Sequence, residues 1–99
     1  MKTKYQVEIT KVATKDVKEI WKYIQQDNQS AADRFIHQLV EQIESLSVHP
    51  ERCASIPENE ILKTQYKHLI YKQYRTIFKI NKNTVYILRI IHGAKLLEI

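Results

Sequence analysis

The stretch YRTIFKINKNTVYILRIIH, residues 74–92, decides the fold of this chain. Its two halves, residues 74–80 and 85–92, are rich in β-branched and aromatic residues, which favour β-strands. The Asn-Lys-Asn segment at 81–83 lies between them, and asparagine tolerates the left-handed backbone that a tight hairpin needs. The stretch therefore predicts a β-hairpin at the C-terminal end of the chain.

The residues before this hairpin predict one more strand and an irregular connection. Residues 66–71 again combine aromatic and β-branched side chains, which predicts a third strand beside the hairpin. Residues 48–60 contain both prolines of the chain and show no sustained periodicity, so we expect an irregular segment there.

Further toward the N-terminus, the apolar residues repeat every three or four positions, which predicts two amphipathic helices. The first helix is expected from about residue 12 to about residue 26, and Ser30 with Asp33 forms a variant of the capping box that would open the second. The connection at 27–29 is so short that the helices should pack as an antiparallel hairpin. The apolar positions are Val17, Ile20, Trp21 and Ile24 in the first helix, and Ala32, Phe35, Ile36, Leu39, Ile43 and Leu46 in the second.

The chain opens with a period-two pattern, in which Tyr5, Val7 and Ile9 alternate with polar residues, and this predicts a strand. The predicted fold class is therefore α+β, with the order β-α-α-β-β-β in a single domain over residues 1–99. The N-terminal strand and helical hairpin should pack on one face of a twisted, mainly antiparallel sheet. We expect the opposite face of the sheet to remain free for binding.

Charge is distributed unevenly along the chain. Residues 62–99 contain eight Lys or Arg and one carboxylate, Glu98, a net charge of +7, whereas residues 1–61 carry a net charge of −2. The basic part is also the part predicted to form the sheet. A positive potential on a rigid surface predicts an anionic partner, either nucleic acid or an acidic protein segment.

Several classes of protein fit the sequence poorly. The single cysteine, Cys53, cannot form a disulfide within the chain, and no apolar run approaches the roughly 20 residues of a membrane span. The N-terminus lacks the apolar region of a secretory signal, so we expect a cytoplasmic protein. His49 and Cys53 have no further ligands nearby to complete a zinc site, and Gly93 is the only glycine, which argues against a phosphate-binding glycine loop. We therefore expect no metal and no cofactor.

Arg75 is the residue that we single out for binding. In a strand over 74–80, Arg75 and Lys79 point away from the face that carries Phe78, so Arg75 would present its guanidinium group on the free face of the sheet. There it could grip a phosphate or a carboxylate through two hydrogen bonds. The structural alternative is a salt bridge from Arg75 to a helix carboxylate or to Glu98. His92, at the end of the last strand, is a candidate proton-transfer group.

The order of elements and the local patterns resemble the RelE/ParE superfamily, the toxins of bacterial type II toxin–antitoxin modules. Almost the whole chain takes part in this resemblance, and no single piece of it is diagnostic. The resembling residues are Ala13, Asp16, Ile20, Trp21, Tyr23 and Ile24; Ala31, Ala32, Phe35, Leu39, Ile43 and Leu46; Tyr74 to Phe78; and Val85 to Lys95.

The resemblance implies a growth-arresting toxin that an antitoxin neutralises with a disordered, usually acidic segment, which agrees with the charge distribution. A ParE-like toxin, as in the plasmid-stabilisation group, would bind DNA gyrase without catalytic residues of its own. Its target-binding residues would be Lys72, Arg75, Lys79 and Lys95. The resemblance does not identify the antitoxin-binding residues.

A RelE-like toxin would instead cleave mRNA on the ribosome. In that case Arg75 would hold the scissile phosphate, His92 would transfer a proton, and Lys72 and Lys95 would add positive charge. The sequence departs from the nuclease pattern at its end, because only Leu-Leu-Glu-Ile follows Lys95. This departure favours the ParE-like interpretation, with the nuclease as the alternative and a simple nucleic-acid-binding module as a third possibility.

Overall fold

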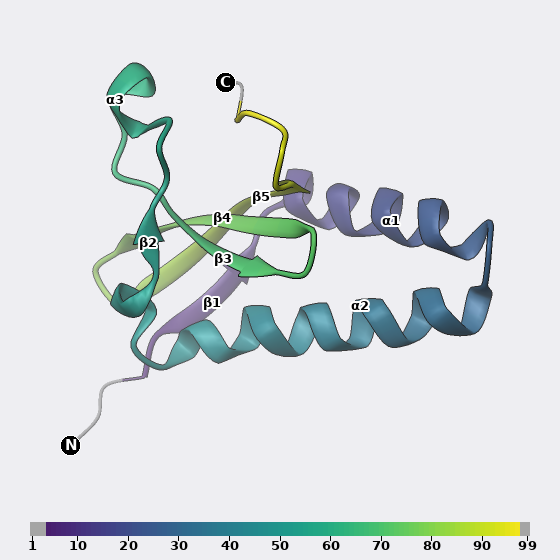
Figure 1. The fold of residues 1–99 in the computed structure, drawn as a ribbon. Helices are drawn as coiled ribbons and strands as arrows, with labels where there is room; N and C mark the ends of the chain where they lie inside the picture. Colours follow the sequence, from purple (N-terminus) through teal and green to yellow (C-terminus); the bar gives the residue numbers. More distant parts are fainter. Residues whose placement is uncertain (1–3, 98–99) are drawn as a thin grey trace.

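The computed structural model describes residues 4–97, which form a five-stranded sheet with two long helices packed on one face (Figure 1). The strand order is β1-β5-β4-β3-β2, in which β1 runs parallel to β5 and the other neighbours are antiparallel. The predicted α+β class and the β-α-α-β-β-β order are confirmed. The elements are β1 (Gln6–Ile9), α1 (Lys11–Gln25), α2 (Gln29–Glu44), the 3-10 turns η1 (Ser45–Ser47) and η2 (Pro50–Arg52), β2 (Ala54–Ser55), α3 (Asn59–Leu62), β3 (Lys67–Tyr71), β4 (Tyr74–Asn81) and β5 (Thr84–His92).

Side-chain caps set where the two long helices begin. The side chain of Thr10 accepts a hydrogen bond from the backbone N–H of Ala13, and that of Asn28 accepts one from Ala31. The predicted capping box at Ser30 is therefore wrong by two residues. Asp33, the other predicted member of that box, accepts a hydrogen bond from the indole N–H of Trp21 at 2.7 Å and ties the two helices together.

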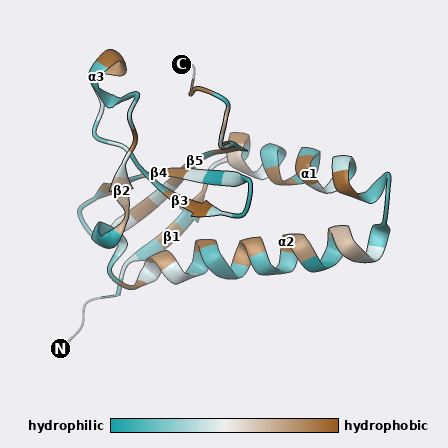
Figure 2. Cartoon of the chain, in the orientation of Figure 1, coloured by the Kyte–Doolittle hydropathy of each residue, from teal (hydrophilic) through white to brown (hydrophobic). Residues whose placement is uncertain are grey.

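The main core lies between the helical hairpin and the sheet, where the apolar faces of both layers meet (Figure 2). Burial of these side chains is the dominant favourable contribution to folding. The buried residues are Ala13, Ile20, Leu39, Ile43 and Leu46 from the helical layer and Phe78, Val85, Ile87 and Ile90 from the sheet.

A β-bulge in β5 changes the alternation of the last strand. Ile77 pairs with Arg89 and Phe78 pairs with Ile87, so Leu88 is the extra residue between them. As a result Ile87 and Ile90, three positions apart, both belong to the main core. Simple period-two counting across β5 would place one of them on the wrong face.

The edge of β5 is covered where β1 stops. The hydroxyl of Thr10 donates to the carbonyl of Ile87 at 2.8 Å, and the Asp16 carboxylate accepts the backbone N–H of Ile90 at 2.9 Å. The same carboxylate accepts a hydrogen bond from the guanidinium of Arg89 at 2.8 Å. Thr10 and Asp16 thus occupy hydrogen-bonding groups that an open strand edge would leave to another chain.

The face of the sheet opposite the long helices is not free around its centre, which corrects the expectation from the sequence. A second, smaller core forms there from Ile56, Ile77, Ile91 and Leu97, with Leu62 and Tyr66 against it. The segment containing α3 and the C-terminal segment that follows β5 supply its outer layer (Figure 1). The 48–60 region therefore contains the 3-10 turn η2, the two-residue strand β2 and the beginning of α3 instead of an entirely irregular loop.

Lysines occupy the left-handed positions of both hairpin turns. Lys72 in the β3–β4 turn has φ 54° and Lys82 in the β4–β5 turn has φ 58°, whereas Asn81 and Asn83 are not in this conformation. A residue with a Cβ atom is disfavoured there by about 1–2 kcal/mol. The asparagine signal predicted the correct turn but not the residue that adopts the left-handed backbone.

Replacing Lys82 by Gly is expected to raise the free energy of unfolding by about 0.5–1 kcal/mol, because glycine relieves the strain at a small cost in chain entropy. Urea denaturation of the purified protein measures this difference. Lys82→Ala is the control, since it removes the charge and keeps the Cβ atom, and it should leave the stability nearly unchanged. A gain with Ala equal to that with Gly would attribute the effect to the lysine charge instead.

Candidate functional site

Arg75 lies in β4 and points toward the smaller core, where only 4% of its surface is exposed. The predicted exposure of its guanidinium group is wrong. Its two terminal nitrogens bind both carboxylate oxygens of Glu58, the residue that precedes α3. The alternative of a salt bridge is therefore right in kind, but the partner is neither a helix carboxylate nor Glu98: Glu58 lies just before α3, in the segment expected to be irregular.

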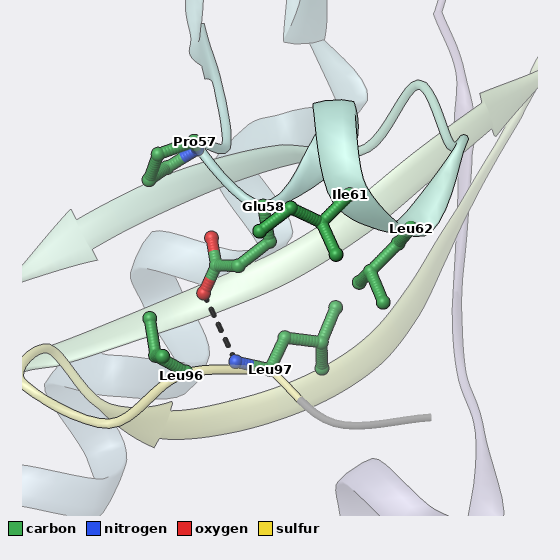
Figure 3. Close-up of a pocket in the computed structure, with 6 residues that line it drawn as sticks. All are labelled: Pro57, Glu58, Ile61, Leu62, Leu96 and Leu97. Carbon is green, nitrogen blue, oxygen red and sulfur yellow. Dashed lines mark hydrogen bonds between the residues drawn. The ribbon is translucent and has the colours of Figure 1, made fainter.

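The Arg75–Glu58 pair joins three segments that are distant in the sequence. The Nη2 atom of Arg75 donates to the carbonyl of Lys95 at 2.9 Å, and Glu58 accepts the backbone N–H of Leu97 at 2.9 Å, the bond drawn in Figure 3. The pair thereby holds the C-terminal segment against α3 and the sheet. The Nε atom of Arg75 is buried without a hydrogen-bond partner, so the guanidinium is not fully satisfied by this arrangement.

His68 on β3 completes the surroundings of the guanidinium. Its Nδ1 atom lies 3.3 Å from Nη1 of Arg75. Because a guanidinium has only donors, Nδ1 accepts this bond and the imidazole is neutral with its proton on Nε2. Burial and the neighbouring Arg75 charge lower the pKa of His68, while Glu58 acts in the opposite direction. His68 is thus a hydrogen-bonded residue of the sheet.

The paired arginine shifts the ionisation of Glu58. Hydrogen bonds from Arg75 are the largest cause that lowers the pKa of Glu58 from 4.5 to about 2, against the opposing effect of burial. Since the pKa is lower in the folded chain, the stabilisation is fully present above pH 4.5 and is lost as the pH falls toward 2.

We expect the difference in unfolding free energy between the wild type and Glu58→Gln to shrink between pH 6 and pH 3 by about 1–2 kcal/mol, allowing for screening by nearby water. Urea denaturation at a series of pH values measures both proteins. The variant removes only this carboxylate, so titration of the other acidic groups cancels in the difference. A difference that stayed constant down to pH 3 would contradict the lowered pKa.

The other predicted site residues lie on two separate parts of the surface. Lys72, His92 and Lys95 lie near the β3–β4 turn, where His92 stacks edge-on against Tyr74 with ring centroids 5.8 Å apart. The backbone N–H of Lys95 donates to the carbonyl of His92 at 2.9 Å. All three side chains belong to exposed residues.

Lys79 is separated from this group. It lies five residues beyond Tyr74 on β4, roughly 16 Å along the strand, and its ammonium group is 5.6 Å from the centre of the Tyr86 ring. The structure thus brings Lys72, His92 and Lys95 to one end of the sheet, buries Arg75 and leaves Lys79 toward the other end. The predicted residues do not form one continuous cationic face.

A mainly apolar groove lies beside the ion pair, between α3 and the C-terminal segment (Figure 3). Its volume is about 330 Å³. In Figure 3 the side chains of Ile61 and Leu62 approach the C-terminal segment from α3. The complete lining is Pro57, Glu58, Ile61, Leu62, Leu96 and Leu97.

Asn59 fixes the loop that carries α3. Its side-chain amide donates to the carbonyl of Tyr66 at 2.9 Å, and its side-chain oxygen accepts the hydroxyl of Thr64 at 2.7 Å and the N–H of Tyr66 at 3.0 Å. One side chain thus closes the loop from α3 to the start of β3. This closure positions Glu58 opposite Arg75.

The sequence interpretation did not select Glu58 or Asn59. One signal could have identified Glu58, because a buried arginine in a strand requires a carboxylate and residues 62–99 supply only Glu98. The candidate partners were therefore Glu98 and the carboxylates of residues 1–61, and Glu58 is one of three glutamates in the 48–60 segment. Among the residues described, 4–97, no three His, Cys, Asp or Glu side chains form a group that could hold a metal ion.

Comparison with known proteins assigns this chain to a family. The family model described as the ParE toxin of the type II toxin–antitoxin system parDE matches residues 7–97. The chain belongs to the ParE toxin family. Membership in the RelE/ParE superfamily, predicted from the sequence patterns, is thereby confirmed.

Two solved structures share the ParE-family fold seen here. A chain of the chromosomal ParDE toxin–antitoxin system from P. aeruginosa superposes with a TM-score of 0.72 and 18% identity, covering 91% of this chain and 97% of its own. A chain of the toxin–antitoxin complex RelBE2 from Mycobacterium tuberculosis gives 0.69 and 24%, with coverages of 94% and 95%. At these identities the likeness establishes the fold alone. Comparison with curated protein sequences gave no significant match.

Proposed function

We propose that this ParE-family toxin arrests growth by binding DNA gyrase in the cytoplasm, and that it does so without cutting RNA. The proposal rests on the burial of Arg75 and on its ion pair with Glu58. Phosphate stabilisation in a nuclease needs a cation that can reach the scissile group. Here the guanidinium is buried and neutralised by Glu58, beneath the C-terminal segment. A phosphate could reach it only if this ion pair opened.

The exposed basic residues at the β3–β4 turn are the proposed contacts with gyrase. Within the described residues, 4–97, neither Lys72 nor Lys95 forms a salt bridge with a carboxylate. Charged groups at the rim of an interface speed association and select the partner. Lys79 is a further candidate contact, whereas Arg75 supports the fold behind this surface.

An antitoxin is the second partner that we assign to this chain. The family description and the two toxin–antitoxin structures support this assignment. The net charge of +7 over residues 62–99 favours an acidic segment of the antitoxin. Such a module would act in plasmid stabilisation or in an equivalent chromosomal role.

A supercoiling assay with purified gyrase tests the main proposal. The wild-type toxin should inhibit supercoiling and accumulate cleaved DNA, and Lys72→Glu/Lys95→Glu should weaken inhibition by about tenfold, which corresponds to 1.4 kcal/mol. Lys82→Glu, in the other hairpin turn, is the matched control and should retain inhibition. A toxin that leaves gyrase fully active would overturn the proposal.

Ribosome-dependent mRNA cleavage is the alternative function. One observation favours it, namely that His92 lies in the same exposed region as Lys72 and Lys95, which together could supply a proton-transfer group and positive charge. Incubation with translating ribosomes and primer extension on the mRNA tests it directly. Cleavage that His92→Gln abolishes would replace gyrase binding as the function.

A further inference from the structure

Three titratable side chains meet beside the C-terminal segment, and only one of them changes its charge near neutral pH. Nδ1 of His68 lies 3.3 Å from Nη1 of Arg75, which also donates to Glu58 at 3.1 Å. Arginine keeps its proton throughout, and the pKa of Glu58 is about 2. Histidine ordinarily takes up a proton near pH 6.5, and the half-buried ring of His68 is accessible to solvent.

The hydrogen bond between His68 and Arg75 requires a neutral imidazole. A guanidinium has only donors, so Nδ1 must offer its lone pair. A proton on Nδ1 would remove this acceptor and would place two cations in direct contact. Glu58 could turn to the charged ring only by giving up bonds, since its two oxygens already bind Arg75 and the N–H of Leu97. Protonation of His68 therefore acts against the arrangement around Arg75.

The same groups hold the segment that follows β5. Nη2 of Arg75 donates to the carbonyl of Lys95 at 2.9 Å, and Glu58 accepts the N–H of Leu97 at 2.9 Å (Figure 3). Lys95 also donates its own N–H to the carbonyl of His92, so its peptide groups are fixed on both sides. Displacement of Arg75 from its partners would thus release Lys95 and Leu97 together.

We propose that His68 is a pH-sensitive latch: its neutral ring holds Arg75 and thereby the segment at 94–97, and its protonated ring releases this segment. Acting through Arg75, His68 is a positioning residue for Lys95. The inference deepens the proposed function and rests on it only in this respect, that Lys95 is a proposed contact with gyrase. The latch itself does not depend on the target.

The direction of the pH response follows from the surroundings of the ring. Burial and then the Arg75 charge lower the pKa of His68 in the closed arrangement, while Glu58 opposes them. In the open arrangement the pKa returns toward its ordinary value of 6.5. The closed state is therefore fully stabilised above pH 6.5 and loses stability as the pH falls below that value. Glu58 responds only below its ordinary pKa of 4.5.

The elements packed against His68 bring few other charges to it among the described residues. Arg75 from β4 and Glu58 from the segment before α3 are the charged groups that act on its ring. Its cross-strand neighbours, Ala54 in β2 and Ile77 in β4, have no titratable side chain. Within residues 4–97, the response near pH 6 thus depends on His68 and on its contact with Arg75.

The C-terminal segment adds three titratable groups that the test must separate from His68. Lys95 is exposed and meets Arg75 through its backbone carbonyl. His92, at the base of the segment, accepts the N–H of Ala94 at Nδ1 at 3.2 Å, so its protonation would break a bond in the same turn. Glu98 lies outside the described residues. Separate variants at His92 and Glu98 are therefore part of the experiment.

Amide hydrogen exchange of the full-length toxin at pH 7 and pH 5 tests the latch. After correction for the intrinsic exchange rate, opening at Leu97 should increase about five- to twentyfold at the lower pH, because the open state gains a proton. His68→Gln should keep Leu97 protected at both pH values, since the amide oxygen accepts from Arg75 and does not titrate. His37→Gln, at an exposed position in α2, is the matched control and should respond like the wild type.

Three results would overturn the inference. The first is a pH response at Leu97 that persists in folded His68→Gln. The second is a response that His92→Gln or Glu98→Gln abolishes, which would assign it to that group. The third is equal protection of Leu97 and of Leu39, in the core of α2, because the segment would then open only when the whole chain unfolds.

A second measurement uses the unaltered protein and stays informative if His68→Gln fails to fold. Nitrogen NMR of the His68 ring should find its proton on Nε2 at pH 7, and the amide shift of Leu97 should follow protonation of this ring. A Leu97 shift that does not follow His68 contradicts the latch. Neither measurement involves gyrase, so a toxin inactive on gyrase leaves both results valid. Gyrase inhibition without opening that depends on His68 would keep the proposed function and reject the latch.

Discussion

Replacing Glu58 by Gln is expected to lower the free energy of unfolding by about 3–5 kcal/mol, because it leaves the Arg75 guanidinium buried without its counter-charge. The substitution also weakens the bond that Glu58 accepts from the N–H of Leu97, so the C-terminal segment should loosen as well. Urea denaturation measures the first effect. Amide hydrogen exchange at Leu97 measures the second.

Two companion variants show whether the ion pair is the cause. Glu60→Gln removes an exposed carboxylate in α3, two residues after Glu58, and should change stability by no more than about 0.5 kcal/mol. Replacing both partners, as Glu58→Met with Arg75→Met, should recover most of the loss, since buried ion pairs often tolerate apolar replacement. If the double variant is as unstable as Glu58→Gln, the damage comes from the space that Glu58 fills and not from the unpaired charge.

The same double variant bears on function. It has no guanidinium at position 75, and it replaces the two hydrogen bonds to the C-terminal segment by apolar contacts. We expect it to inhibit gyrase as well as the wild type if Arg75 only supports the fold. A folded double variant that had lost all toxicity would indicate that Arg75 itself contacts the target.

Phe78→Ala is the second large effect that we expect, a loss of about 3–5 kcal/mol in unfolding free energy. Phe78 is fully buried in the main core between the helical hairpin and the sheet. Its removal would leave a cavity that helices α1 and α2 can fill only by moving toward the sheet. Thermal and urea denaturation measure the loss.

Ile70→Ala provides the comparison for this prediction. Ile70 belongs to the same sheet, but its side chain is 64% exposed, and its truncation should cost no more than about 0.5 kcal/mol. Equal losses at both positions would mean that the helical layer contributes little to stability. A much larger loss at Phe78 supports the packing described here.

Local patterns predicted most of the fold because each element depends on nearby residues. The alternation of Tyr5, Val7 and Ile9 and the helical spacing of Leu39, Ile43 and Leu46 reflect which side of a strand or helix faces the core. The bulge at Leu88 was not predicted. It depends on how β4 pairs with β5, and this pairing produces no repeating pattern in the sequence of either strand.

The candidate site was harder to predict than the fold. The strand alternation correctly assigned Arg75 to the face opposite the long helices, but it gave no information about what covers that face. The cover comes from α3 and from the C-terminal segment, about 17 residues before and 20 residues after Arg75. A one-turn helix is too short to give a periodic signal.

By itself, the sequence determined the class of fold, the placement of the helices on one face, the accumulation of positive charge in residues 62–99 and the resemblance to the toxin superfamily. The first three follow from composition or from spacing along the chain, and the resemblance lies in the order of elements and in local sequence patterns. Only the tertiary structure decided that Glu58 neutralises Arg75 and that Ile61 and Leu96 border one groove. These contacts join segments whose approach depends on the packing of the whole chain, since a buried charge is tolerated only where folding supplies its partner.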